Sequence, residues 1–444
     1  MRYDVMIIGG GPGGYTAALK AAGNGLQTVL FEKDKIGGTC LNRGCIPTKS
    51  LIESSRYYRN AGNGELFGVN TEGLSFDYGK VEARRDEVVE KLRSGIEKRL
   101  KAAKVDIVEG QAMIVSPHLV TCNGESYEGE NIIIATGSCI SKPPIEGIEH
   151  CVTSDDILEK SFALPSGMII IGGGVIGCEI ADALSAFGTR ITILELADRL
   201  LPVMDKELGQ RLGMFFKKKG IEVSTSVKVL RIEKQDDRKT VYYSDKNGNE
   251  QAIEADEVLI AAGRKANVAD LCGPELDLAI NRGVVNKDGK TSFDNIYVIG
   301  DAGEDNIQLA HFAQGQGENV IDMILKKDMT NDLSVIPSCV YTDPEIAGVG
   351  TGEEQLKAEG TEYRVSKYLT GANGRCLIEN AESGFVKLIT VNDVIVGGQI
   401  ISPHATELIG ELAIAVEKKM TIGELAEVVH PHPTISEMIW EAAK

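Results

Sequence analysis

The pattern of apolar and polar positions occurs twice along the chain. Residues 4–32 read DVMIIGGGPGGYTAALKAAGNGLQTVLFE, and residues 168–195 read MIIIGGGVIGCEIADALSAFGTRITILE. Each segment predicts a short apolar strand, a glycine-rich turn, a helix with small residues on its inner face and a second apolar strand that ends in glutamate. This order is typical of a dinucleotide-binding unit, so the duplication predicts two such units.

The two copies share the spacing between their glycines and the closing glutamate, because the first glycine of each precedes the glutamate by 23 positions. The first glycine permits a tight turn, the second lets the backbone approach a pyrophosphate, and the third lets the helix pack on the strand. The helix N-terminus presents amides to the phosphates, and the glutamate can accept hydrogen bonds from ribose hydroxyls. The expected dinucleotide-binding residues are Gly9, Gly11, Gly14 and Glu32 in the first copy, and Gly172, Gly174, Gly177 and Glu195 in the second.

Three further apolar segments predict strands that are buried on both faces of a parallel sheet, because their apolar runs do not alternate with polar residues. They are NIIIATGS at 131–138, EVLIAAGRKAN at 257–267 and IYVIGDAG at 296–303, and the first two end alike. The strand expected in the last segment ends at Gly300 and Asp301. The Asp301 carboxylate can bind a ligand hydroxyl or cap a following helix, and the spacing leaves both uses open.

From residue 333 onward the pattern changes. The segments YTDPEIAGVG, YRVSKY, GFVKLITV and IVGGQII predict an antiparallel sheet with one solvent-facing side. Residues 405–419 carry an apolar stripe that predicts a surface helix. The expected fold is therefore α/β, with two Rossmann-like dinucleotide-binding domains and a C-terminal α+β domain.

Composition narrows the range of functions. A chain of 444 residues is long enough for several domains, and its formal charge of −18 argues against a nucleic-acid surface, which needs clustered Lys and Arg. Glycines interrupt the N-terminal apolar run after a few residues, so it predicts neither a signal peptide nor a membrane span. We expect a cytoplasmic protein.

Two of the nine cysteines stand out, because Cys40 and Cys45 lie close together in IGGTCLNRGCIPTKSL, residues 36–51. In a regular helix their Cα atoms would be roughly 8.7 Å apart, beyond the roughly 7 Å that a disulfide spans. The turn between them must therefore be distorted, and Gly44 lowers the energetic cost of that distortion because glycine adopts a wider range of backbone conformations. Lys49 and a helix N-terminus would both favour the reactive thiolate. A zinc site is the alternative use, but the matching second pair that such sites need is absent, so redox use is favoured.

The segment HPHPTISE near the C-terminus contains His432 between two prolines, which hold the chain extended. An imidazole can accept a proton from a dithiol, and Glu437 could orient it. Alternatively, Thr434 and Glu437 form a capping box for the helix that follows. The residues alone leave both interpretations open.

The motifs GGGPGG, GGTCLNRGCIPTK, GGGVIGCE, IYVIGDAG, YTDPEIAGVG and HPHPTISE resemble those of the pyridine nucleotide-disulfide oxidoreductases, in the order of that family and over the whole chain. The resemblance implies FAD at the first glycine turn and NAD at the second. It implies that Cys40 exchanges with the dithiol substrate, that Cys45 lies against the flavin in a charge-transfer complex, and that Lys49 and Glu179 form a buried ion pair beside the flavin. Further cofactor-binding positions that it implies are Thr39, Lys49, Thr136, Gly137, Gly263 and Asp301.

The resemblance also implies a homodimer in which His432 and Glu437 of one chain serve the active site of the other as catalytic base and its partner. The implied domains are an FAD-binding domain at 1–140, an NAD-binding domain at 141–265, a central domain at 266–332 that completes the FAD site, and a dimerisation domain at 333–444.

The activity that the resemblance implies is oxidation of protein-bound dihydrolipoamide with reduction of NAD+. The partner would be the lipoyl domain of a 2-oxo acid dehydrogenase or glycine cleavage complex. The alternative is an NADPH-dependent reductase of another disulfide, such as glutathione. Glu195 favours NAD because it would repel a 2′-phosphate, although Arg199 lies only four residues later. A flavoprotein that serves only as a structural subunit is disfavoured by the intact cysteines.

Overall fold

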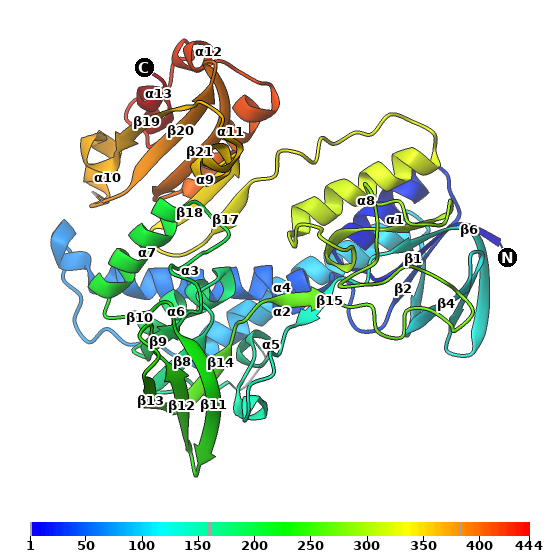
Figure 1. Cartoon of the computed structure of the whole chain (residues 1–444), viewed down its shortest axis with the longest axis horizontal. Coiled ribbons are helices and arrows are strands. Elements are labelled where there is room, and N and C mark those ends of the chain that lie inside the picture. Colours follow the sequence, from blue (N-terminus) through cyan, green and yellow to red (C-terminus); the bar gives the residue numbers. More distant parts are fainter. Residues whose placement is uncertain (1, 159–161, 382) are drawn as a thin grey trace.

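The computed structural model describes residues 2–158, 162–381 and 383–444. Figure 1 shows three groups of elements: the first sheet on the right, the second sheet at the lower left and the C-terminal sheet at the upper left. The first sheet has the strand order β3-β2-β1-β6, with β16 beside β6, and all of these strands are parallel. These strands are β1 (Arg2–Ile8), β2 (Thr28–Glu32), β3 (Asp106–Glu109), β6 (Glu125–Ile134) and β16 (Ile296–Val298).

Helices and an antiparallel extension complete this unit. Helix α1 (Pro12–Gly23) connects β1 to β2 and packs against α8 (Ala310–Ile324), so a segment far along the chain returns to the first sheet. Strands β4 (Ala112–Ser116) and β5 (Leu119–Cys122) extend the sheet beside β6. Apolar clusters lie on both faces of the parallel strands, as the uninterrupted apolar runs predict.

The second sheet repeats the first. Its order is β10-β9-β8-β14, all parallel, which matches the order of the first four strands above. The elements are β8 (Gly167–Ile171), α6 (Val175–Ala186), β9 (Arg190–Leu194), α7 (Lys206–Lys218), β10 (Glu222–Ser224) and β14 (Glu257–Ile260). The predicted duplication of a Rossmann-like unit is therefore confirmed.

An antiparallel meander is inserted before β14, and the sequence pattern did not predict it. Its strands are β11 (Lys228–Gln235), β12 (Arg238–Ser244) and β13 (Glu250–Ala255). These strands carry many charged residues, and β11 buries only Ile232 fully. A strand with so little buried apolar surface gives a weak periodic signal.

The chain crosses between the first two sheets twice, at a two-stranded ribbon. Strand β7 (Ser138–Ile140) follows β6 on the way out, and β15 (Arg264–Ala266) follows β14 on the way back. The segments that directly follow β6 and β14, two strands whose ends are alike in sequence, are thus joined by direct pairing.

The C-terminal sheet is antiparallel, as predicted, with the order β17-β18-β21-β20-β19. Its strands are β17 (Ser338–Val340), β18 (Glu345–Gly350), β19 (Arg364–Leu369), β20 (Phe385–Val391) and β21 (Val394–Ser402), and its helices are α9 (Glu353–Glu359), α10 (Gly374–Ile378), α11 (Ala405–Glu417), α12 (Ile422–Ala426) and α13 (Glu437–Ala443). Helix α11 matches the predicted 405–419. The predicted solvent-facing side is wrong for β20 and most of β21, whose residues are buried on both faces.

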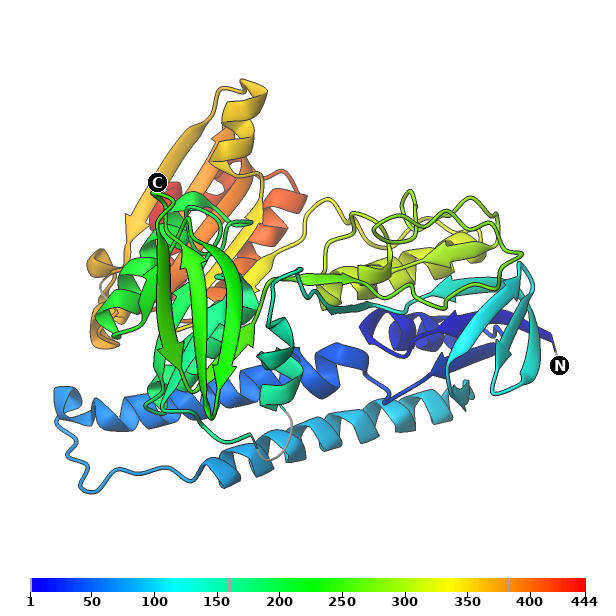
Figure 2. The ribbon, with the colours of Figure 1, turned by 60° about the horizontal axis from the view of Figure 1, so that its bottom comes forward.

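Two long helices link the three groups. Helix α3 (Cys45–Gly62) packs against both α4 (Tyr78–Ala102) and α6, and Figure 2 shows α3 and α4 running along the lower side of the molecule. The guanidinium of Arg59 on α3 bonds the Asp182 carboxylate of α6 at 3.1 Å and the Asp343 carboxylate before β18 at 3.1 Å. Helix α3 is thereby fixed to the second and third groups, and it begins at Cys45.

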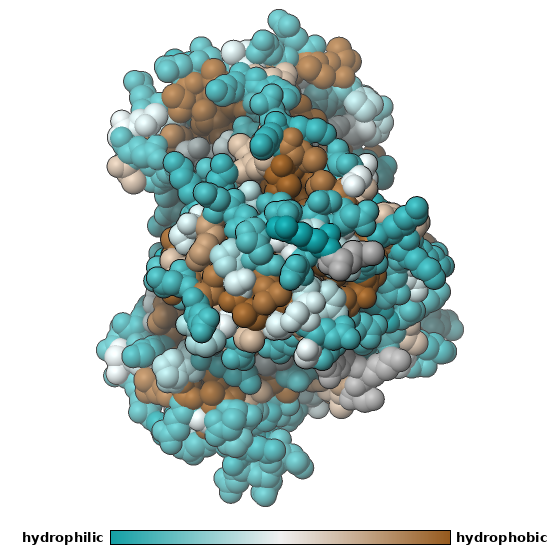
Figure 3. Space-filling model, turned by 90° about the vertical axis from the view of Figure 1, so that its right-hand side faces the viewer, coloured by the Kyte–Doolittle hydropathy of each residue, from teal (hydrophilic) through white to brown (hydrophobic). Residues whose placement is uncertain are grey.

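Hydrophilic residues cover most of the face shown in Figure 3, which agrees with the acidic composition. Among the described residues, no helix combines the length and the apolar character that crossing a bilayer requires.

Candidate active site

One cavity of about 2490 Å³ joins both glycine turns and the cysteine segment. Its walls come from all three groups of elements, including α11 of the C-terminal domain through Glu407 and Ile409. Of the residues singled out in the sequence, the following line it: Gly9, Gly11, Glu32, Thr39, Cys40, Cys45, Lys49, Thr136, Gly137, Gly172, Gly174, Glu179, Glu195, Gly263 and Asp301.

The two glycine turns have the same geometry. Gly9 has a φ of +108° and Gly172 a φ of +112°, a region that side chains rarely adopt. A Cβ added to Gly14 would lie 1.9 Å from the Gly9 carbonyl oxygen, and one added to Gly177 would lie 2.1 Å from that of Gly172. Gly14 and Gly177 do not line the cavity, because they pack the helix against the turn.

The two closing glutamates bond their own turns. A Glu32 carboxylate oxygen accepts the Gly10 N–H at 2.7 Å, and a Glu195 oxygen accepts the Gly173 N–H at 2.5 Å. Burial raises the pKa of Glu32, and the Gly10 N–H opposes that effect. The sequence predicted ribose contacts for these residues but not this second role, in which each carboxylate stiffens the turn that it follows.

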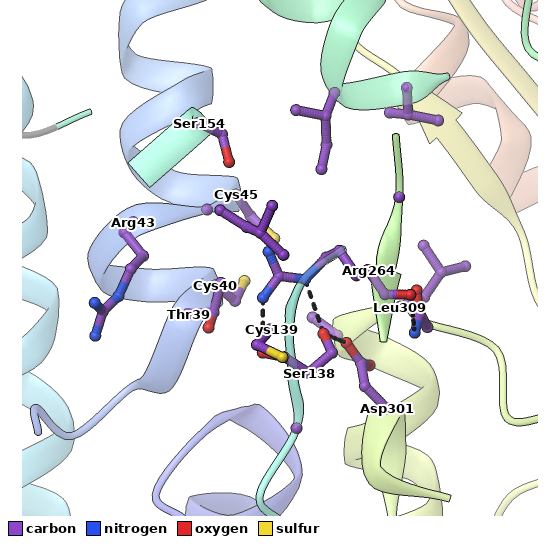
Figure 4. Close-up of a pocket in the computed structure, with 18 of the residues that line it drawn as sticks. Thr39, Cys40, Arg43, Cys45, Ser138, Cys139, Ser154, Arg264, Asp301 and Leu309 are labelled. Carbon is purple, nitrogen blue, oxygen red and sulfur yellow. Dashed lines mark hydrogen bonds between the residues drawn. The ribbon is translucent and has the colours of Figure 1, made fainter. Parts of the chain in front are cut away.

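The cysteines lie on either side of a helix break. Helix α2 (Gly38–Arg43) carries Cys40, α3 begins at Cys45, and Gly44 between them has φ −131° and ψ −113°. The predicted distortion is therefore confirmed. A Cβ on Gly44 would lie 2.9 Å from the Thr39 carbonyl oxygen, which explains the glycine. Figure 4 shows both cysteine side chains at the cavity.

The environment divides the two thiols into different roles. The pKa of Cys45 is lowered to about 7, chiefly by a hydrogen bond from Cys40, with burial opposing and Lys49 assisting. The pKa of Cys40 lies well above its usual range, because its proton is held by Cys45 and because the side chain is partly buried. In the dithiol form Cys45 is thus the thiolate and Cys40 the hydrogen-bond donor.

Lys49 and Glu179 are brought together as an ion pair between α3 and α6. The Lys49 ammonium lies 2.8 Å and 3.0 Å from the two Glu179 carboxylate oxygens. The Tyr341 N–H donates to the same carboxylate at 3.0 Å, and the ammonium lies 4.6 Å from the centre of the Tyr341 ring. Three distant segments therefore fix one positive charge beside the cysteines.

Asp301 follows β16 and faces the ribbon between the sheets. The Ser138 hydroxyl donates to its carboxylate at 2.6 Å, and the Arg264 guanidinium donates to the Ser138 hydroxyl at 2.8 Å (Figure 4). The next α-helix, α8, begins only at Ala310, and no side-chain cap precedes it. Asp301 is therefore not a cap of that helix, and it lines the cavity.

The cavity suits a dinucleotide on two grounds. The Thr136 hydroxyl is buried in the wall and has no hydrogen-bond partner among the described residues. Such an orphaned group is rare in proteins unless a ligand completes it. Next to the second turn, a Cβ added to Gly174 would meet no atom within 4 Å, so the start of α6 is open to a pyrophosphate.

His432 and Glu437 form a pair away from this cavity. The His432 Nδ1 and a Glu437 carboxylate oxygen are 2.9 Å apart, and the His432 side chain is 78% exposed. Glu437 also accepts the Thr434 N–H at 2.8 Å, while the Thr434 hydroxyl donates to the Pro431 carbonyl at 2.7 Å instead of capping the helix. Only half of the capping box exists, and the same carboxylate holds the imidazole.

A single chain does not bring this pair to the cysteines. Neither residue is among the described residues that line the cavity. In Figure 1 the segment between α12 and α13 lies on the far side of the C-terminal sheet from α2.

The sequence missed several residues of the cavity wall. Ser138 and Arg264 follow the two strand ends that look alike, and that likeness was the only signal for their pairing. Cys139 and Cys339 are partly exposed and line the cavity, whereas the other cysteines outside the pair do not line it.

Comparison with known proteins identifies the family of the chain. The family model described as "Pyridine nucleotide-disulphide oxidoreductase" matches residues 3–317, and the model of that family's dimerisation domain matches residues 336–443. The chain belongs to this family. Its relatives include proteins named dihydrolipoyl dehydrogenase from Bacillus subtilis, 38% identical over 100% of this chain and 97% of the relative, and from Geobacillus stearothermophilus, 39% identical over 99% and 95%.

Solved structures of other members have the same fold. The HOCl-induced flavoprotein disulfide reductase RclA from Escherichia coli superposes with a TM-score of 0.87 at 29% identity, over 99% of both chains. LpdA from Mycobacterium tuberculosis superposes with a TM-score of 0.90 at 25% identity, again over 99% of both. A dimerisation domain of this family therefore ends the chain.

Proposed function

We propose that this protein oxidises protein-bound dihydrolipoamide to lipoamide and reduces NAD+, through a disulfide between Cys40 and Cys45. The observation that carries the proposal is the cysteine pair itself, which opens into the cavity shared by two dinucleotide turns. Full-length similarity to proteins named dihydrolipoyl dehydrogenase supports this substrate.

The assignment of cofactors follows the two turns. FAD would lie on the turn of Gly9 and Gly11 with Thr39, Lys49, Thr136, Gly137 and Asp301 around it, and NAD on the turn of Gly172 and Gly174 with Glu195 and Gly263. This corresponds to an FAD domain at 1–140, an NAD domain at 141–265, a central domain at 266–332 and a dimerisation domain at 333–444. When bound, FAD supplies the acceptor for an electron pair and NAD+ the acceptor for a hydride.

The difference between the two thiols sets the direction of exchange. A substrate thiolate attacks the Cys40 sulfur and breaks the disulfide, because Cys45 has the lower pKa and is the better leaving thiolate. The second substrate thiol then displaces Cys40, which leaves as a thiol, and the substrate closes to its own disulfide. The bond between sulfurs has then passed from the protein pair to the substrate, and two electrons have passed from the substrate to the protein pair, which is now a dithiol.

The substrate thiols must lose protons, and His432 is the proposed acceptor. Its imidazole is exposed, and the Glu437 carboxylate orients it. The pKa of Glu437 is lowered by the Thr434 N–H and by His432, so this carboxylate remains ionised. Because one chain keeps His432 away from its own cysteines, we propose that the His432 of a second copy serves each site, within a homodimer.

We expect NAD to be preferred over NADP. Glu195 lines the cavity, and both of its oxygens are occupied by backbone N–H groups, at 2.5 Å from Gly173 and 2.6 Å from Ala197. Arg199, the residue that could bind a 2′-phosphate, is instead bonded to Glu354 at 2.8 Å. A higher kcat/KM with NADPH than with NADH would contradict this preference.

The deciding experiment is a steady-state assay of flavin-loaded protein with dihydrolipoamide and NAD+. Turnover that disappears in Cys45→Ser supports the proposal. Absence of turnover by the unmodified protein, with oxidised glutathione reduced by NADPH instead, would reject the substrate and favour the alternative reductase. Co-purification with a lipoyl domain would test the partner, a 2-oxo acid dehydrogenase or glycine cleavage complex.

A further inference from the structure

The loop that follows Glu195 is held by the C-terminal domain. This loop, residues 196–205, connects β9 to α7, and Leu196, Pro202, Val203 and Met204 line the cavity at the second glycine turn. Leu200 and Leu201 in its middle are buried, at 2% and 0% exposed, whereas Leu196 is 70% exposed and Val203 is 89% exposed. The parts of the loop on either side of the buried leucines must therefore be held by other contacts.

The first anchor is a buried lysine on β20. The Lys387 side chain is only 1% exposed, and its ammonium lies 2.7 Å from the Asp205 carboxylate and 3.0 Å from that of Glu353 on α9. Burial acts to lower the pKa of Lys387, but these two carboxylates raise it above its usual value. The lysine is thus a cation that requires its partners, because a buried charge without them is costly.

Asp205 connects Lys387 to the loop beside the second glycine turn. Its carboxylate also accepts the Glu207 N–H at 3.0 Å, which caps the start of α7. The residue therefore ends the loop, begins the helix and bonds Lys387 with one side chain. A Cβ added to Gly209 would lie 2.1 Å from the Leu200 carbonyl oxygen, so the first turn of α7 packs directly on the loop.

A second anchor acts in the middle of the loop. The Arg199 guanidinium bonds the Glu354 carboxylate of α9 at 2.8 Å and the Pro202 carbonyl at 3.4 Å. Both anchors thus reach the C-terminal domain, at adjacent acidic residues of α9. In Figure 1, α7 lies directly beside the C-terminal sheet and α9.

We propose that Lys387 is a positioning residue for the nicotinamide nucleotide: from the dimerisation domain it holds Asp205 and so fixes loop 196–205 against the cavity. The proposal rests on the assignment of NAD to the second glycine turn. Lys387 touches neither the cysteines nor the first turn, so its influence falls on nucleotide binding and not on the exchange of thiols.

The test compares Lys387→Met and Asp205→Asn with Arg364→Gln. Asparagine at position 205 can still cap α7 but has no negative charge to pair with Lys387. The Asp205→Asn variant therefore still tests the proposal if Lys387→Met does not fold. Arg364 lies on β19 in an exposed pair with Asp393 at 3.4 Å and serves as the matched control. For each flavin-loaded variant we would measure the KM for NAD+, the Kd for NADH and the rate at which dihydrolipoamide reduces the flavin without NAD+.

We expect the KM for NAD+ and the Kd for NADH to rise about tenfold in the first two variants, since small misplacements of binding groups are expensive, while the rate of flavin reduction stays within twofold. Nucleotide parameters that stay within twofold of the unmodified protein, or a rate of flavin reduction that falls equally, would overturn the proposal. A different result is expected if NAD does not bind at the second glycine turn at all. The variant Gly174→Asp adds a negative charge at the start of α6 without a steric clash, and in that case it would leave the Kd for NADH unchanged.

Discussion

At the residue scale, the two cysteines differ because the proton between their sulfurs stays on Cys40. Cys40 keeps the proton and Cys45 carries the charge, and the hydrogen bond between them contributes more to the low pKa of Cys45 than Lys49 does. Two identical side chains five positions apart thus acquire opposite roles. Lys49 supplies the positive charge, and Glu179 holds it in place.

This unequal sharing gives a pH dependence with a definite sign. The thiolate of Cys45 forms as the pH rises through about 7, so in the reduced protein the ultraviolet thiolate absorbance should titrate with a midpoint near this value. In Cys40→Ala the hydrogen bond is lost, and we expect the midpoint to move to higher pH. Cys45→Ser should lose the titration altogether. An unchanged midpoint in Cys40→Ala would show that the hydrogen bond does not stabilise the thiolate.

The exposed imidazole permits a second measurement at this scale. His432→Gln should lower kcat for dihydrolipoamide oxidation by about 10²-fold or more, the usual contribution of a general base. Oxidation of NADH by a quinone, which needs no exchange of thiols, should be unaffected. His150→Gln is the control, because His150 is another partly exposed histidine near a glutamate, at 3.9 Å from Glu149. Equal losses in both reactions would argue against a role as base.

At the element scale, the break between α2 and α3 is what separates the two thiols. Gly44→Ala would press a Cβ to 2.9 Å from the Thr39 carbonyl oxygen, and the backbone has to shift to relieve it. We expect a loss of about 1–3 kcal/mol in the free energy of unfolding, as for other overpacked sites.

Thermal unfolding of the flavin-loaded protein measures this change. The matched control is Gly95→Ala within α4, where an added Cβ meets no atom within 4 Å. That variant should gain about 0.5–1 kcal/mol, because alanine favours a helix interior. A stability of Gly44→Ala equal to or above that of the unmodified protein would mean that the break does not depend on glycine.

Elements with strong local signals were predictable from the sequence. The two β-α-β repeats, the distorted turn at the cysteines and the helix at 405–417 follow from glycine positions and apolar periodicity, which are local properties. The meander of β11 to β13 and the burial of both faces of β20 were not predicted. The first has few buried apolar residues, and the second depends on which distant helix covers the sheet.

At the scale of the whole molecule, the role proposed for His432 would require two chains for one site, because a single chain keeps this residue away from its own cysteines. A mixture of Cys45→Ser and His432→Gln chains tests this directly. Each variant alone should be nearly inactive, but in a mixed dimer one site combines intact cysteines with an intact histidine. After joint unfolding and refolding, or co-expression, we expect about a quarter of the unmodified activity, since half of the dimers are mixed and each has one working site. No recovery despite mixed dimers on native mass spectrometry would mean that each chain uses its own histidine.

The contacts between the domains could not be predicted from the sequence, for a physical reason. Arg59, Asp182 and Lys219 meet in one cluster, with ion pairs of 3.1 Å and 2.7 Å around a carboxylate that is 2% exposed. Each of the three looks like an ordinary surface charge in its own segment, because its partners lie far away along the chain. The same holds for Lys387 within the apolar strand GFVKLITV. The Lys49–Glu179 pair was expected only because a family resemblance pointed to it.

The separate bonding of the two closing glutamates has a consequence for redesign. Glu32 accepts the Gly10 N–H of the first turn and Glu195 accepts the Gly173 N–H of the second, so each half of the duplication is held by its own glutamate. An engineer who wishes to exchange one coenzyme for its phosphorylated analogue can therefore alter the later half while the prosthetic group stays seated in the earlier one.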